Sequence, residues 1–145
     1  MEQTKKAAAP RRLKQGYDYL VDFSQRSVLL TDILRKRGNT YLEHLIQKLA
    51  LQDVHALHGR AEELGQDPQH RERYDWALAR AVAEMPILLE YLLPLVRVRG
   101  AALAQKGERA GAEMQGAEAA LNALGGRVQK LVPVELHGLA ETRYL

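Results

Sequence analysis

The chain has 145 residues, of which 46% are hydrophobic and 27% charged, with a formal net charge of +3 and no cysteine. This length suits one domain with a core of its own. The lack of cysteine excludes disulfide bonds, thiolate zinc sites and thiol catalysis, and it fits a reducing compartment such as the cytoplasm.

The excess positive charge lies at the N-terminus. Residues 1–16 carry five basic side chains and one acidic side chain, which leaves 16 basic and 17 acidic side chains in the rest of the chain. This segment has no apolar periodicity and no hydrophobic stretch of the kind a secretion signal needs, so it is predicted to be a flexible basic arm. A weak contact of the arm with phosphate or an anionic surface is the alternative.

Apolar residues return at three- and four-residue steps over much of the chain, which is typical of helices. The spacing predicts a first helix over about 17–37. Residues 38–40 supply a C-terminal glycine and new capping residues, and a second helix follows to about residue 64. Residues 65–68 then predict a stop and a restart at a proline.

A third helix is predicted from the spacing of apolar residues that begins at Tyr74 and ends at Leu95. It runs through Pro86 and Pro94, so we expect it to bend at both. Residues 101–131 keep a seven-residue rhythm of small apolar side chains and predict a fourth, weak helix that ends before Pro133.

The sequence therefore predicts an all-α fold, because no segment alternates as a strand does. We expect a four-helix antiparallel bundle with a long proline-kinked third helix. The expected organisation is a basic arm over 1–16, a helical bundle over 17–132 and a C-terminal tail over 133–145.

The most apolar stretch is MPILLEYLLPLVRV, residues 85–98. It is shorter than the roughly 20 apolar residues that span a membrane, and Glu90 interrupts it, so no transmembrane segment is predicted. Besides the side chains that face the bundle, it has others that would leave an apolar outer surface for a hydrophobic partner. These are Ile87, Leu89, Tyr91 and Leu93.

Few residues suggest a catalytic or metal-binding site. His55 and His58 would share one helical face with Glu62, which makes a candidate metal site, although a solvated polar face is the alternative. The only serines, Ser24 and Ser27, lie in no nucleophile elbow, and the chain has no phosphate-binding loop or dinucleotide fingerprint. We therefore expect no enzymatic activity and no cofactor.

Residues 17–45, YDYLVDFSQRSVLLTDILRKRGNTYLEHL, resemble the N-terminal helical region of a bacterial family found near polyhydroxyalkanoate synthases. In that family an α/β-hydrolase-like domain follows, which this chain is not expected to contain because it has no cysteine, no nucleophile elbow and no predicted strands. The alternative is that the shared polar residues only cap and pair within the bundle. The positions that carry the resemblance include Gln25, Arg26, Arg35, Arg37 and Asn39.

In composition the chain is also similar to phasins, the helical proteins that coat polyester granules. The resemblance implies a non-enzymatic, cytoplasmic interaction protein that binds a granule surface or a protein partner and forms a homo-oligomer. The alternative is a bundle that binds a small ligand or a metal between its helices. Nucleic-acid binding is disfavoured because the body of the chain is nearly neutral.

Overall fold

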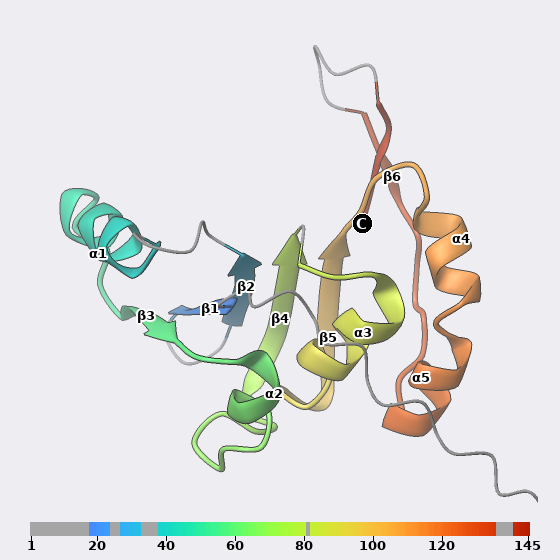
Figure 1. Ribbon diagram of the computed structural model, residues 1–145, viewed down its shortest axis with the longest axis horizontal. Coiled ribbons are helices and arrows are strands. Elements are labelled where there is room, and N and C mark those ends of the chain that lie inside the picture. The colour runs from blue at the N-terminus through green and yellow to red at the C-terminus, as the bar shows by residue number, and fades with distance from the viewer. Residues whose placement is uncertain (1–17, 24–26, 33–37, 81, 136–140) are drawn as a thin grey trace, which may run out of the picture.

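The computed structural model describes residues 18–23, 27–32, 38–80, 82–135 and 141–145. These residues form an α/β fold, so the predicted all-α bundle is wrong. Figure 1 shows a twisted sheet with helices beside it, and a small two-stranded sheet near the C-terminus. Among the described residues, no helix is long and apolar enough to cross a membrane.

The main sheet has five strands in the order β3-β1-β2-β4-β5. They are β1 (Asp18–Phe23), β2 (Ser27–Asp32), β3 (Val54–His58), β4 (Tyr74–Arg80) and β5 (Val96–Gln105). The helices are α1 (Gly38–Lys48), α2 (Ala61–Leu64), α3 (Met85–Leu92), α4 (Ala110–Gln115) and α5 (Glu118–Leu124). The second sheet pairs β6 (Pro133–Val134) with β7 (Arg143–Tyr144).

Strand direction divides the main sheet into two parts. The strands β2, β4 and β5 are parallel to one another, whereas β1 is antiparallel to both β2 and β3. Parallel neighbours need a crossover connection, and α3 supplies it between β4 and β5. The carboxyl ends of β2, β4 and β5 therefore lie at one edge of the sheet.

The core lies between the sheet and α3. In one row across three strands, Val28 pairs with Ala77 and Ala77 pairs with Ala102. Val28 and Ala77 are fully buried, and Ala102 packs against the same core. Small side chains on the strands let the helix approach closely, and Leu88 and Leu92 fill the space between, 2% and 1% exposed.

Each predicted helix covers a different set of observed elements. The first spans β1 and β2, the second spans α1, β3 and α2, the third spans β4 and α3, and the fourth spans the end of β5 with α4 and α5. Buried strands of a parallel sheet are apolar almost without alternation, so their residues also satisfy a three- and four-residue spacing.

The two prolines of the apolar stretch bound α3 and do not kink it. Pro86 is the second residue of the helix, where a missing backbone N–H leaves no intrahelical bond unmade. Pro94 lies in the turn after Leu92, and there it helps to end the helix. The single carboxylate of the stretch, Glu90, is exposed.

A turn-like irregularity within β5 holds a strained residue. Arg99 has a φ of 68°, a left-handed conformation that costs a non-glycine residue about 1–2 kcal/mol. The next residue must be a glycine, because a Cβ on Gly100 would lie 2.5 Å from Val96 Cγ1 and 2.7 Å from the carbonyl oxygen of Asp75.

We expect Leu88→Ala to lower the free energy of unfolding by about 2–5 kcal/mol, because it leaves a cavity between α3 and the sheet. Urea unfolding followed by circular dichroism measures the loss. The control is Val98→Ala, at a side chain that is 76% exposed, which should cost less than about 0.5 kcal/mol. Equal losses in the two variants would contradict this core.

We expect Arg99→Gly to raise the free energy of unfolding by up to about 1 kcal/mol, since glycine relieves the left-handed strain but loses more chain entropy on folding. Thermal unfolding measures the change. The neighbouring Arg97→Gly should instead lower stability, because Arg97 has no positive φ and forms an ion pair with Asp75. Destabilisation by both variants would show that the turn is not strained.

Candidate functional site

Three parallel strands end side by side at one edge of the sheet. The β2 strand ends at Asp32, β4 ends at Arg80 and β5 ends at Gln105. Arg80 is in register with Gln105 on one side and with Thr31 on the other. Open sheets of parallel strands bind their ligands at this carboxyl edge, so these ends are the place to look for a site.

A partly buried ion pair stands at this edge. The Lys106 ammonium group, just beyond β5, lies 2.6 Å from the Glu113 carboxylate on α4. The two side chains are only 11% and 19% exposed. The same ammonium group donates a hydrogen bond to the carbonyl oxygen of Ala83, at 2.6 Å, in the connection between β4 and α3.

The Glu113 carboxylate also holds the start of α3. The backbone N–H of Met85 donates to the same Glu113 oxygen that binds Lys106, at 3.1 Å. The first N–H groups of a helix have no intrahelical partner, and a carboxylate there satisfies one of them and interacts well with the helix dipole. Lys106 and Glu113 together therefore fix the connection that follows β4.

The C-terminal segment braces the same point. The backbone N–H and carbonyl groups of Lys106 exchange two hydrogen bonds with those of Tyr144, both at 2.9 Å. This bridge joins the end of β5 to β7 and holds the Lys106 backbone in place. The side chain of Lys106 is thus positioned by contacts on three separate segments.

Arg80 is an exposed cation of this edge. Its side chain is exposed, and no ion pair to it is found in the described part of the chain. Glu84 and Arg109 lie 4.0 Å apart nearby and are 72% and 80% exposed, so their attraction is weak. The edge thus offers an exposed guanidinium beside a rigid loop, a combination suited to binding an anionic or polar ligand.

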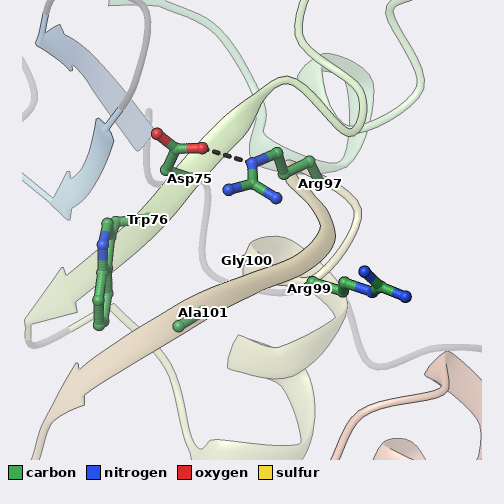
Figure 2. A pocket seen from close by; sticks show the side chains of 6 residues that line it. All are labelled: Asp75, Trp76, Arg97, Arg99, Gly100 and Ala101. Atoms are coloured by element: carbon green, nitrogen blue, oxygen red, sulfur yellow. Dashed lines mark hydrogen bonds and ion pairs between the residues drawn. The ribbon is translucent and has the colours of Figure 1, made fainter.

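The opposite edge holds a shallow hollow of about 200 Å³. Figure 2 shows the Arg97 guanidinium meeting the Asp75 carboxylate there, with the Trp76 ring standing away from both. The hollow lies where β4 and β5 begin, and it is smaller than the roughly 300–1,000 Å³ of a typical ligand pocket. Strand topology therefore favours the carboxyl edge over this hollow as the site.

The candidate metal residues lie on a strand and a short helix. His55 and His58 are exposed residues of β3, three positions apart, so their side chains leave opposite faces of the strand. Glu62 accepts a hydrogen bond from Arg60 at 3.2 Å, and this contact holds the pKa of the Arg60 guanidinium above its ordinary value. No group of three potential ligands is arranged around a metal position within the residues that the structure describes.

The expected hydrophobic docking residues lie on α3 or directly after it. Leu89 and Tyr91 are 7% and 5% exposed and belong to the core. Ile87 and Leu93 are partly buried and pack against that core. This helix therefore does not present them together as an open apolar surface.

The polar positions of the family-like segment fall mostly outside the described residues. This is true of Gln25, Arg26, Arg35 and Arg37, and Asn39 lies near the start of α1. Residues 18–23 and 27–32 of the segment form strands and only its end, from residue 38, is helical, so the helical region expected from the resemblance is wrong over the strands.

Sequence reasoning missed Arg80, Lys106 and Glu113. A usable signal was present, because Arg80 directly follows one apolar segment and Gln105 and Lys106 follow another, as polar residues at the ends of buried strands do. Because both segments were predicted to be helical, Arg80 and Lys106 were expected on the surface of a helix and not at the end of a strand.

We expect Glu113→Gln to lower the free energy of unfolding by about 1–3 kcal/mol, because it leaves the nearly buried Lys106 ammonium without a counter-charge. Lys106→Met should cost a similar amount. The double variant should show a coupling of about 0.5–3 kcal/mol in urea unfolding, as contacting residues do. The control is Glu84→Gln in the exposed pair, at less than about 0.5 kcal/mol. Additive losses would contradict the pairing.

Comparison with known proteins gives a consistent result. A model of the GidB family, rRNA small subunit methyltransferase G, matches residues 20–139. The ribosomal RNA small subunit methyltransferase G of Lactobacillus delbrueckii subsp. bulgaricus is 48% identical over 118 residues, which are 81% of this chain and 49% of the relative. The proteins of the same name from Alkaliphilus metalliredigens and Acetivibrio thermocellus are 45% and 41% identical, over 78% and 83% of this chain and 47% and 49% of their own lengths.

The chain thus spans about half the length of the curated relatives it matches. These matches overturn the resemblance to phasins and to a family near polyhydroxyalkanoate synthases, together with the expected granule partner. The expectations of a non-enzymatic protein and of no nucleic-acid partner are wrong as well, since the matching family is one of rRNA methyltransferases. The chain belongs to the rRNA small subunit methyltransferase G family.

Proposed function

We propose that this chain is part of a methyltransferase that modifies the rRNA of the small ribosomal subunit. The observation that carries the proposal is the family match over residues 20–139, which includes every strand of the parallel region. The geometry supports it, because the polar ends of β2, β4 and β5 lie at the edge where α/β enzymes bind ligands.

The charge of the chain suits an RNA substrate. The net charge is +3, and the sequence isoelectric point is about 9.3. Basic side chains bind phosphates without regard to base sequence, and they raise the rate of association with RNA. Residues 1–16, with four net positive charges, are the most basic part of the sequence. We assign the protein to the cytoplasm, where its rRNA substrate would be.

The residues of the carboxyl edge have separable roles in this proposal. Arg80 is exposed at the end of β4 and is available to bind a phosphate or another anionic group. Lys106 and Glu113 are positioning residues, because they hold the connection after β4 through Ala83 and Met85. A loop held in this way keeps the polar end of β4 in one place while a substrate binds.

The methyl donor implied by the family is S-adenosylmethionine, a nucleoside that would supply the methyl group. Nucleosides bound by doubly wound sheets lie over a glycine-rich turn between a strand and a helix. The connection after β4 has no glycine over residues 82–84. Gly59 and Gly107 follow β3 and β5 singly, and each already lies against a side chain, Leu64 and Arg143, at 3.4 Å from an added Cβ. The described residues do not form a donor site by themselves.

Deleting the gene for this chain should remove a methyl group from small-subunit rRNA. Mass spectrometry of nuclease fragments of that rRNA measures the change, and returning the gene should restore the methyl group. Returning it with Arg80→Ala should restore less, because the exposed cation at the carboxyl edge is lost.

The matched control for this experiment is a gene that carries Arg109→Ala. Arg109 is 80% exposed and only weakly paired, so its loss removes one positive charge without touching the ends of the strands. Small-subunit rRNA that keeps every methyl group after the deletion would overturn the proposed function.

A further inference from the structure

The start of β5 departs from regular pairing with β4. The pairing advances from Tyr74 to Trp76 on β4, while on β5 it steps from Val96 to Ala101. Residues 97–100 of β5 therefore lie opposite a single residue of β4. Extra residues of this kind bend a strand locally and redirect its side chains, and they are common next to functional sites. We call residues 97–100 the β5 bulge.

The side chains of the β5 bulge are exposed and its backbone is strained. Arg97, Val98 and Arg99 are exposed, and Arg99 has the left-handed φ described above. Core packing does not explain an exposed arginine at a position that glycine would occupy with less strain. Strained residues concentrate at sites that bind ligands, so the β5 bulge is a place to look for a contact with a partner.

The surface around the β5 bulge is positively charged. Residues 71–76 and 96–101 lie side by side and together carry four arginines and two carboxylates. All four arginines are exposed. Asp75 forms an ion pair with Arg97, whereas no ion pair to Arg99 is found within the ranges that the structure describes. An excess of cations on one surface attracts an anionic partner.

An exposed aromatic ring lies beside these cations. Trp76 is 48% exposed, and it lines the same shallow hollow as Arg97 and Arg99. Figure 2 shows the ring and the two guanidinium groups spread out around Gly100, not converging on one point. A hollow of about 200 Å³ is also small for a whole ligand. The arrangement therefore suits one unit of an extended anionic chain better than a compact molecule.

We propose that Trp76 and the β5 bulge form a second contact for single-stranded RNA, at the edge of the sheet opposite the strand ends. Trp76 stacks on one unpaired base, and Arg99 binds a neighbouring phosphate. Arg97 adds a further charge in the direction that its ion pair with Asp75 fixes. An aromatic platform on a positive surface is the combination with which proteins bind single strands without base-specific hydrogen bonds.

This inference rests on the proposed function and deepens it, because it places the rRNA substrate at both ends of β4. Trp76 and Arg80 are four residues apart on that strand, or about 13 Å at 3.3 Å per residue. One RNA segment can contact both, since single-strand sites cover about 4–16 nucleotides.

The test measures binding of the full chain to fluorescein-labelled oligouridine of about ten nucleotides, a length within the usual site sizes. Fluorescence anisotropy at several salt concentrations gives the dissociation constant Kd and its salt dependence. Trp76 is the only tryptophan of the chain, so its emission reports on stacking when the RNA carries no label. We expect quenching of Trp76 that saturates with the same Kd as the anisotropy.

Two kinds of variant separate stacking from charge. Trp76→Ala should weaken binding about tenfold, as the loss of one stacked base does, with an unchanged salt dependence. Trp76→Phe keeps an aromatic face and should restore most of the affinity. Arg99→Gly should weaken binding and reduce the slope of log K against log salt by about 0.7, the value for one phosphate contact with a single strand.

Stability and charge are controlled separately. Arg99→Gly is expected to make the fold more stable, so weaker RNA binding by this variant does not come from unfolding. The matched control is Arg109→Ala, which removes one positive charge from a side chain that is 80% exposed and lies outside the β5 bulge. It should leave the Kd for oligouridine nearly unchanged. Circular dichroism confirms that each variant is folded.

Three results would overturn the proposal. They are the absence of oligouridine binding, binding that both Trp76→Ala and Arg99→Gly leave intact, and saturation of the anisotropy without quenching of Trp76. Tighter binding of a polyglutamate peptide than of oligouridine would identify an acidic protein segment as the occupant instead, and would overturn the RNA contact too.

These outcomes are distinct from those of the gene deletion described above. If the variants weaken RNA binding but small-subunit rRNA keeps every methyl group after the deletion, the proposed function fails and the RNA contact stands. If the deletion removes a methyl group and the variants bind RNA normally, only the contact at Trp76 and the β5 bulge fails.

Discussion

The parallel pairing of β4 with β5 is the constraint on which the rest of the structure depends. Parallel neighbours cannot be joined by a tight turn, so the chain must cross one face of the sheet between them, and α3 is that crossover. This explains why the stretch around α3 is apolar on most sides. It packs on the sheet through Leu88 and Leu92, and beyond the helix Leu93 packs against the same core and lies close to Gly126, just after α5. Within α3 itself, only Glu90 is exposed.

The sequence predicted the packing residues of this stretch better than its secondary structure. Of the residues on the apolar spacing between Tyr74 and Leu95, Met85, Leu88, Leu92 and Leu95 are buried, since a face of α3 does meet the core, whereas Leu78 is partly exposed. The strands were missed because their inward residues are alanines, which have the highest helix propensity, and because leucines on the other face filled the remaining positions of a helical spacing. Whether an alanine lies in a strand is decided by a neighbouring strand far away in sequence, which local spacing does not register.

The ion pair of the candidate site could not be predicted from a helical spacing for the same reason. In the predicted fourth helix, Lys106 and Glu113 would be seven residues and therefore about 10.5 Å apart along the axis, too far for an ion pair. They meet because Lys106 ends a strand and the chain then turns back into α4. For His55 and His58 the helical prediction had the opposite effect. It brought together two side chains that would share a face in a helix but lie on opposite faces of a strand. The repeat of side-chain directions, about 3.6 residues in a helix and two in a strand, therefore decides which side chains lie on one face and can act together.

The uneven sheet and the incomplete site have one origin in topology. Crossovers between parallel strands are right-handed, so the connections β4–α3–β5 and β2–α1–β3, which step in opposite directions across the sheet, send their helices to opposite faces. The face on the side of α3 is filled by this chain's own residues, whereas the face assigned to α1 keeps Leu78 and Trp76 partly open to solvent. The point where such connections diverge is also where nucleosides bind. The end of β4, which carries the exposed Arg80, lies at this point, so the same topology that leaves one face partly open also places the candidate site.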